Sequence, residues 1–199
     1  MQKHNIPKTD LTASALVLGT DLFGSTISRE MSIQLMDLYI ESGGNMIDTA
    51  ELYARWLPGG EHQSEWVIGQ WLRERGVRDQ IILSTKGAHP RLDSMHVPRL
   101  SKAEMQSDLD SSLRRLGVEH IDIYWLHRDA PGYPVDEILE TTESFRQAGK
   151  IFQLQGSRDP WITGLSPAAR MPEILFHLAC FDRSPNANLF EINNHKPFV

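Results

Sequence analysis

The feature of this sequence that most constrains its fold is a regular alternation of short apolar runs with segments of helical periodicity. Four apolar runs are candidate strands, at 15–20, 46–47, 81–85 and 121–126, and 151–154 is a candidate fifth strand. Each of the four runs is followed by a segment with apolar residues at helical spacing, so the pattern repeats about every 30 to 40 residues. Continuously apolar strands separated by helices are typical of a parallel sheet with right-handed crossovers. We therefore expect an α/β fold of about four βα units.

Residues that start and stop helices bound the helical segments. The expected starts are Ser28, Ser64, Ser101 and Pro134. The expected ends are the glycines Gly43, Gly76, Gly117 and Gly149. The clearest start is Ser101, because Glu104 follows three residues later and completes a capping box.

The composition excludes several classes of protein. The chain has 199 residues and a formal net charge of −6, so it offers no basic stripe for nucleic-acid phosphates. We find no apolar run of the roughly 20 residues that a membrane span needs. The single cysteine, Cys180, has no partner for an internal disulfide, and we therefore expect a reducing compartment such as the cytoplasm.

Chemically active side chains follow the candidate strands, where parallel α/β sheets bind ligands. Asp48 follows the second strand and Tyr53 lies five residues further on; Lys86 ends the third strand and His127 ends the fourth. These residues suit proton delivery to a carbonyl oxygen. A phenol is a weak acid at neutral pH, a nearby ammonium lowers its pKa, and an imidazole can orient the carbonyl.

Each of these residues also has an ordinary structural interpretation. A lysine at the end of a strand is usually a solvated charge, an aspartate there is often a cap, and a tyrosine or histidine often only packs. Their joint placement at the strand ends is what favours a site. A metal site at His89, His96, His127 and Asp129 is not expected, because their spacing matches no zinc pattern.

Four segments carry a resemblance to a known family: VLGTDLFG at 17–24, GGNMIDTAELYA at 43–54, ILSTKG at 82–87 and SLRRLGVEHIDIYWLHR at 112–128. Over about residues 15–151 the chain resembles the aldo-keto reductases. The most specific part is IDTA-x-x-Y combined with STKG and a strand that ends in LHR. The resemblance implies a (β/α)8 TIM barrel that reduces aldehydes or ketones with NADPH or NADH.

The resemblance also implies a role for each matching residue. Tyr53 would be the proton donor, and Lys86 would lower its pKa. Asp48 would pair with Lys86, and His127 would orient the carbonyl. Gly19, Thr20 and Asp48 would lie near the nicotinamide ring, and Ser157 would hold its carboxamide.

The match is weaker toward the end of the chain. A barrel of this kind takes about 250 residues, and the chain lacks the later units whose loops hold the dinucleotide. By itself it is therefore not expected to bind the cofactor firmly. We divide it into a partial barrel at 1–159 and a divergent, irregular tail at 160–199. A frameshift, mis-splicing or genuine divergence would each explain that tail. Open barrel edges would favour self-association.

Two functions from different classes are consistent with these observations. The first is NAD(P)H-dependent reduction of a small carbonyl compound, impaired if the later barrel units are missing. The second is a non-catalytic binding or regulatory protein derived from such a reductase. The four retained residue types favour the enzyme, because a protein without turnover is free to lose them.

Overall fold

The computed structural model describes residues 1–6, 9–128, 130 and 132–156. In this part of the chain, five strands form one sheet in chain order: β3 (Leu18–Gly19), β4 (Met46–Asp48), β5 (Ile82–Gly87), β6 (Ile121–Leu126) and β7 (Ile151–Gly156). All four neighbouring pairs are parallel. The expected parallel sheet is therefore confirmed, including the candidate fifth strand.

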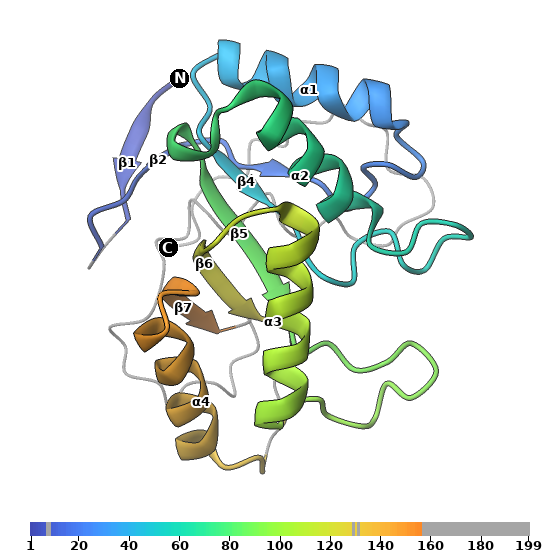
Figure 1. Cartoon of the computed structure of the whole chain (residues 1–199), viewed down its shortest axis with the longest axis vertical. Helices are drawn as coiled ribbons and strands as arrows, with labels where there is room; N and C mark the ends of the chain where they lie inside the picture. The colour runs from blue at the N-terminus through green and yellow to red at the C-terminus, as the bar shows by residue number, and fades with distance from the viewer. Residues whose placement is uncertain (7–8, 129, 131, 157–199) are drawn as a thin grey trace, which may run out of the picture.

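Helices connect these strands and lie together on one side of the sheet (Figure 1). They are α1 (Arg29–Glu41), α2 (Gln63–Arg75), α3 (Lys102–Leu116) and α4 (Val135–Gln147), with a short 3-10 helix η1 (Arg78–Gln80) before β5. Consecutive parallel strands with all helices on one face form an arc of a β/α barrel. The expected partial barrel is thus the observed architecture.

The main core fills the layer between the sheet and the helices. Ile47 and Leu83 from the strands pack in the same buried cluster as Met36, Ile68 and Leu109 from the helices, and all five are fully buried. Burial of a side chain of this size stabilises a fold by roughly 1.5–3 kcal/mol. The core is therefore large enough to fix the strands that carry the site.

A buried ion pair joins α2, α3 and β5. The Arg115 Nε atom donates to Glu65 Oε2 at 2.7 Å, and Thr85 Oγ1 donates to Glu65 Oε1 at 2.7 Å. The two helices approach closely at Gly69, where a Cβ atom would lie 2.2 Å from the Arg115 carbonyl oxygen. Only glycine fits at this contact.

The inner face of the sheet is closed at one end by a hairpin of β1 (Lys3–Asn5) and β2 (Thr12–Ser14). Ile6 and Ala13, in and beside this hairpin, pack with Met46, Ile82 and Ile123. Met46 and Ile82 begin their strands, so the hairpin covers the amino ends. The sequence did not predict these short strands. The carboxyl ends lie opposite, where the candidate site residues were expected.

The local signals were mostly right, with two corrections. The capping box of Ser101 and Glu104 is present, and Gly117 ends α3 in a left-handed conformation. Ser64 is not a helix cap. The cap position of helix α2 lies two residues earlier, at a left-handed His62, and Ser64 Oγ instead bonds Thr20 Oγ1 and Thr49 Oγ1, each at 2.8 Å. The strand expected at 15–20 is regular only over Leu18–Gly19.

No helix among the described residues is long and apolar enough to span a membrane. The tail at 160–199 and Ser157 lie outside the described residues.

Candidate active site

The structure brings Asp48, Tyr53, Lys86 and His127 together at the carboxyl ends of neighbouring strands. Asp48 is the last residue of β4, Lys86 is the next-to-last residue of β5, and His127 directly follows β6. Tyr53 reaches the same place from the turn after β4, which is tied to β5 by the Glu51 amide donating to the Lys86 carbonyl at 2.9 Å.

Lys86 is the centre of the arrangement. Its Nζ atom donates to the Tyr53 hydroxyl at 2.7 Å and to the Thr49 carbonyl oxygen at 2.9 Å, and it forms an ion pair with Asp48 Oδ2. It also lies 4.5 Å from the centroid of the Tyr53 ring. An ammonium group has three N–H donors, so all three are used by these acceptors.

The Tyr53 phenol is buried, with 9% of its surface exposed. Burial raises its pKa to about 12, and Lys86 opposes that shift without overcoming it. The sequence predicted a pKa lowered by the lysine. The contribution of Lys86 has the predicted sign, but the net shift is upward because a buried phenolate loses its hydration. Tyr53 is therefore a neutral phenol with a proton to give.

His127 faces Tyr53 edge to face, with ring centroids 6.1 Å apart. Its buried Nδ1 atom has no hydrogen-bond partner among the described residues. Burial, reinforced by the positive charge of Lys86 and by His89, holds the pKa of His127 well below its usual value of 6.5. A neutral imidazole beside the phenol can donate one hydrogen bond without carrying a charge.

Gly19 and Thr20 lie beside Asp48. Gly19 is exposed and pairs with Asp48 across β3 and β4. The Thr20 side chain is fully buried, and its Oγ1 donates to the Asp48 carbonyl oxygen at 2.9 Å. The Thr20 hydroxyl therefore supports the Asp48 backbone.

Two loops that carry site residues contain strained backbone. Ala54, which follows Tyr53, has φ of 65°, His62 has φ of 58°, and Ala88, two residues after Lys86, has φ of 62°. Non-glycine residues in this region cost on the order of 1–3 kcal/mol each and persist only where surrounding contacts hold them.

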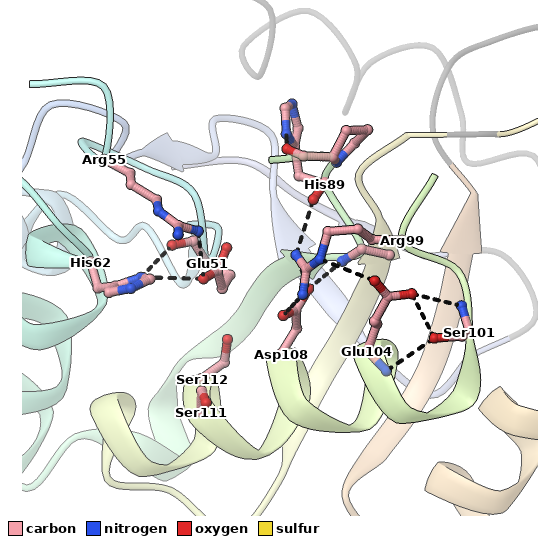
Figure 2. A network of polar contacts seen from close by, with 12 residues as sticks. Glu51, Arg55, His62, His89, Arg99, Ser101, Glu104, Asp108, Ser111 and Ser112 are labelled. Carbon is pink, nitrogen blue, oxygen red and sulfur yellow. Dashed lines mark hydrogen bonds and ion pairs between the residues drawn. The ribbon is translucent and has the colours of Figure 1, made fainter. Parts of the chain in front are cut away.

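Figure 2 shows contacts that hold the loop after Tyr53. His62 Nδ1 lies 2.8 Å from the Glu51 carbonyl oxygen and 3.4 Å from Glu51 Oε1, and Arg55 Nη1 lies 3.5 Å from the same Oε1. Glu51 is buried, and its other oxygen has no partner among the described residues. This group anchors the segment that leads from Tyr53 to α2.

A second group in Figure 2 holds the loop after Lys86. Arg99 Nη2 donates to Asp108 Oδ1 at 2.6 Å, and Asp108 Oδ2 accepts from the Ala88 amide at 2.9 Å. Arg99 Nη1 also donates to the His89 carbonyl oxygen at 3.0 Å. His89 lies against His127, with ring centroids 4.7 Å apart.

Sequence reasoning missed two residues in contact with the expected set. His89 was considered only as a metal ligand, yet it packs against His127. Ser84 was treated only as part of a strand, yet its Oγ donates to Asp48 Oδ1 at 2.8 Å. The sequence could have indicated this contact, because residues two apart in a strand point to the same face and Ser84 lies two residues before Lys86.

Comparisons with known proteins agree with this architecture. The model of the Aldo/keto reductase family matches residues 15–163. Aldo-keto reductase YhdN of Bacillus subtilis is 32% identical over 155 residues, which are 76% of this chain and 45% of that protein. The uncharacterized oxidoreductase YqkF of Bacillus subtilis is 30% identical over 200 residues, which are 98% of this chain and 62% of that protein.

A solved structure gives the same result. The holo form of aldo-keto reductase AKR11C1 from Bacillus halodurans superposes with a TM-score of 0.68 at 30% identity, covering 82% of this chain and 53% of that one. The chain thus spans about half the length of most of these relatives. With a family model over most of its length and a partial barrel that matches a solved member, this chain belongs to the aldo/keto reductase family.

Proposed function

We propose that this chain carries the proton-transfer residues of a reductase that converts aldehydes or ketones to alcohols with NADPH or NADH. The observation that carries the proposal is the hydrogen bonding of Lys86, whose donors are all used by Asp48, the Thr49 carbonyl and Tyr53. The lysine is thereby fixed as a donor to the phenol oxygen. This is the arrangement that proton delivery from Tyr53 requires.

The direction of these bonds leaves the Tyr53 proton available. Because Tyr53 Oη accepts from Lys86, its own hydrogen must point to another acceptor. Asp48 Oδ2 lies 3.5 Å from the Tyr53 hydroxyl, which is long for an O–H···O bond. A substrate carbonyl oxygen would be a better acceptor, and transfer of the proton would leave a phenolate beside the Lys86 ammonium.

His127 would place the substrate for this step. Its neutral ring lies edge to face with Tyr53, where an N–H group can donate to the same carbonyl oxygen and stabilise the charge that develops on it. The bound nicotinamide would supply the hydride to the carbonyl carbon. Gly19, Thr20 and Asp48 are the residues that we assign to its surroundings, and Ser157 is the proposed partner of its carboxamide.

The donor set fits such a cofactor. A neutral phenol, an ammonium beside it and a neutral imidazole provide a proton and charge stabilisation, and no group among them provides electrons. The reduction therefore needs a hydride source, and members of this family generally use NADPH or NADH. The residues described above do not discriminate between NADPH and NADH.

Tyr53→Phe tests the proton-donor role in an assay of NADPH-dependent aldehyde reduction. Loss of a general acid costs roughly 100- to 10,000-fold in rate. Tyr124→Phe is the matched control, because that buried hydroxyl has no hydrogen-bond partner among the described residues. Activity that survives Tyr53→Phe would contradict the proposed role.

Cofactor binding is tested separately by titrating NADPH and following the fluorescence of the five tryptophans. Because the chain spans about half the length of its relatives, we expect weak binding, with quenching that saturates only at high cofactor concentration. No saturation up to millimolar cofactor would refute the proposal that this chain acts as a reductase by itself.

Two further parts of the proposal concern the setting of the protein. With Cys180 as its one cysteine, we propose a reducing compartment such as the cytoplasm. We also propose that copies associate through the barrel edges, which light scattering after gel filtration tests. A strictly monomeric mass at all concentrations would count against it.

A further inference from the structure

A chain of hydrogen bonds lies beneath Asp48 on the inner face of the sheet. The Trp125 indole Nε1 donates to Ser84 Oγ at 2.7 Å, and Ser84 Oγ donates to Asp48 Oδ1 at 2.8 Å. The three residues come from the adjacent strands β6, β5 and β4, and Asp48 and Ser84 are paired in register. Ser84 is fully buried and Asp48 is 4% exposed.

The chemistry of the three groups fixes the direction of the chain. An indole N–H can only donate, so Ser84 Oγ must be the acceptor of that bond. A hydroxyl has a single hydrogen, which Ser84 is then free to direct at Asp48. A carboxylate can only accept, so the bond cannot run the other way.

As a result, the two carboxylate oxygens of Asp48 have different partners. Oδ1 is bound from below by Ser84, and Oδ2 faces Lys86 and lies 3.5 Å from the Tyr53 hydroxyl. Rotation of the carboxylate would break the bond to Ser84. Ser84 therefore fixes the oxygen to which Lys86 is paired, and through Lys86 the position of the phenol.

We propose that Ser84 and Trp125 are positioning residues for the Asp48–Lys86–Tyr53 group. For catalysis this rests on the proposed function. The orientation of Tyr53 itself can be measured whether or not the chain turns over. Neither residue is assigned a contact with the substrate, and both act through the Asp48 carboxylate.

Three variants separate positioning from folding. Ser84→Ala removes the hydroxyl but leaves the Trp125 N–H without its serine acceptor, which by itself destabilises a fold. Trp125→Phe removes the indole donor. The double variant removes both partners of the bond between Trp125 and Ser84, so the cost that remains is the lost bond from Ser84 to Asp48 Oδ1. Trp71→Phe is the matched control, because its indole donates to Asp37 at 2.8 Å from a fully buried position away from the site.

The first measurement is the NMR signal of the Tyr53 ring carbon that bears the hydroxyl, in protein labelled at its four tyrosines and assigned with Tyr53→Phe. We expect this signal to shift in Ser84→Ala, in Trp125→Phe and in the double variant, and to stay in place in Trp71→Phe. An unchanged Tyr53 signal in Ser84→Ala and in the double variant would overturn the proposal, with or without activity.

The second measurement is the reductase assay on the same variants. Misplacement of a reacting group by about 1 Å can cost on the order of 100-fold in rate, so we expect kcat to fall by roughly 10- to 100-fold while KM changes little. The double variant should recover the part of the unfolding midpoint that Ser84→Ala loses through the Trp125 N–H, but it should not recover kcat. Recovery of both would assign Ser84 and Trp125 a purely structural role. A wild-type chain without activity would refute the proposed function, and the NMR result would still decide the positioning.

Discussion

The pKa of Tyr53 provides the sharpest quantitative test of the site. Burial raises it from its ordinary value near 10 to about 12. A group whose pKa is raised by folding stabilises the fold at low pH, and that stability is lost as the pH rises from the unfolded to the folded value. The window is therefore about pH 10 to 12. Two units at about 1.4 kcal/mol each give a total loss of about 2.7 kcal/mol.

The measurement is the free energy of unfolding in denaturant at pH 8 and pH 11, for the wild type and for Tyr53→Phe. At pH 11 the ratio of ionised to neutral phenol is about 10 in the unfolded chain. In the folded protein the same ratio is about 0.1. Tyr53 should therefore make the wild type lose about 1.4 kcal/mol more than the variant. Groups that do not contact Tyr53 titrate alike in both proteins and cancel, and Lys86, whose pKa Tyr53 helps to raise, adds a loss of the same sign in the wild type. Tyr124→Phe should show the same sign, because burial also raises the pKa of that phenol.

The outcome distinguishes burial from the influence of Lys86. Equal losses in the wild type and Tyr53→Phe would mean that the folded pKa stays near 10, which refutes the effect of burial. A smaller loss in the wild type would mean that the ammonium outweighs burial and lowers the pKa, as the sequence alone suggested. Only a larger loss in the wild type agrees with the structure.

Three further predictions follow from other contacts. Burial, and after it the charge of Lys86, lower the pKa of His127, so His127 should add no titration to kcat/KM between pH 6 and 8. A kcat/KM that falls toward pH 6 in the wild type but not in His127→Gln would contradict this. Gly87→Ala would place a Cβ atom 2.0 Å from the Tyr124 hydroxyl oxygen, so it should lower the free energy of unfolding by about 1–3 kcal/mol, and Tyr124→Phe in the same chain should restore part of it. Arg115→Met would leave Glu65 buried without its cation and should cost about 3–5 kcal/mol in denaturant titrations; a cost below about 1 kcal/mol would show that the pair is not buried.

Most of the fold could be predicted because its signals are local. The strand at 121–126 is a run of apolar residues that ends where the sequence suggested, and the capping box at Ser101 needs only Glu104 three residues away. The hairpin of β1 and β2 could not be predicted in this way. Its strands have three residues each and one is exposed throughout, so they show little apolar alternation, and their place depends on Met46 and Ile82 from distant strands.

Ser64 shows how tertiary contacts override a local rule. A serine before a helical apolar pattern normally caps the helix. Here the Ser64 hydroxyl points into the fold instead and bonds the buried hydroxyls of Thr20 and Thr49. The residue that precedes the first turn of α2 is instead His62. It adopts a left-handed backbone conformation, and its ring bonds the Glu51 carbonyl oxygen. The helix was predicted correctly, and its first residue was decided by the loop after Tyr53.

The grouping of Asp48, Lys86 and His127 could be predicted from the sequence, but the energetics of the candidate site could not. Asp48, Lys86 and His127 were found because parallel strands deliver their last residues to a common edge, whatever the surrounding loops do. The pKa of Tyr53 depends on how much water the folded site excludes. That exclusion comes from the packing of separate segments around the phenol, including Trp56 at 6.4 Å between ring centroids and His127 at 6.1 Å. A sequence shows that a lysine lies near the phenol, and a fold is needed to show that burial outweighs it.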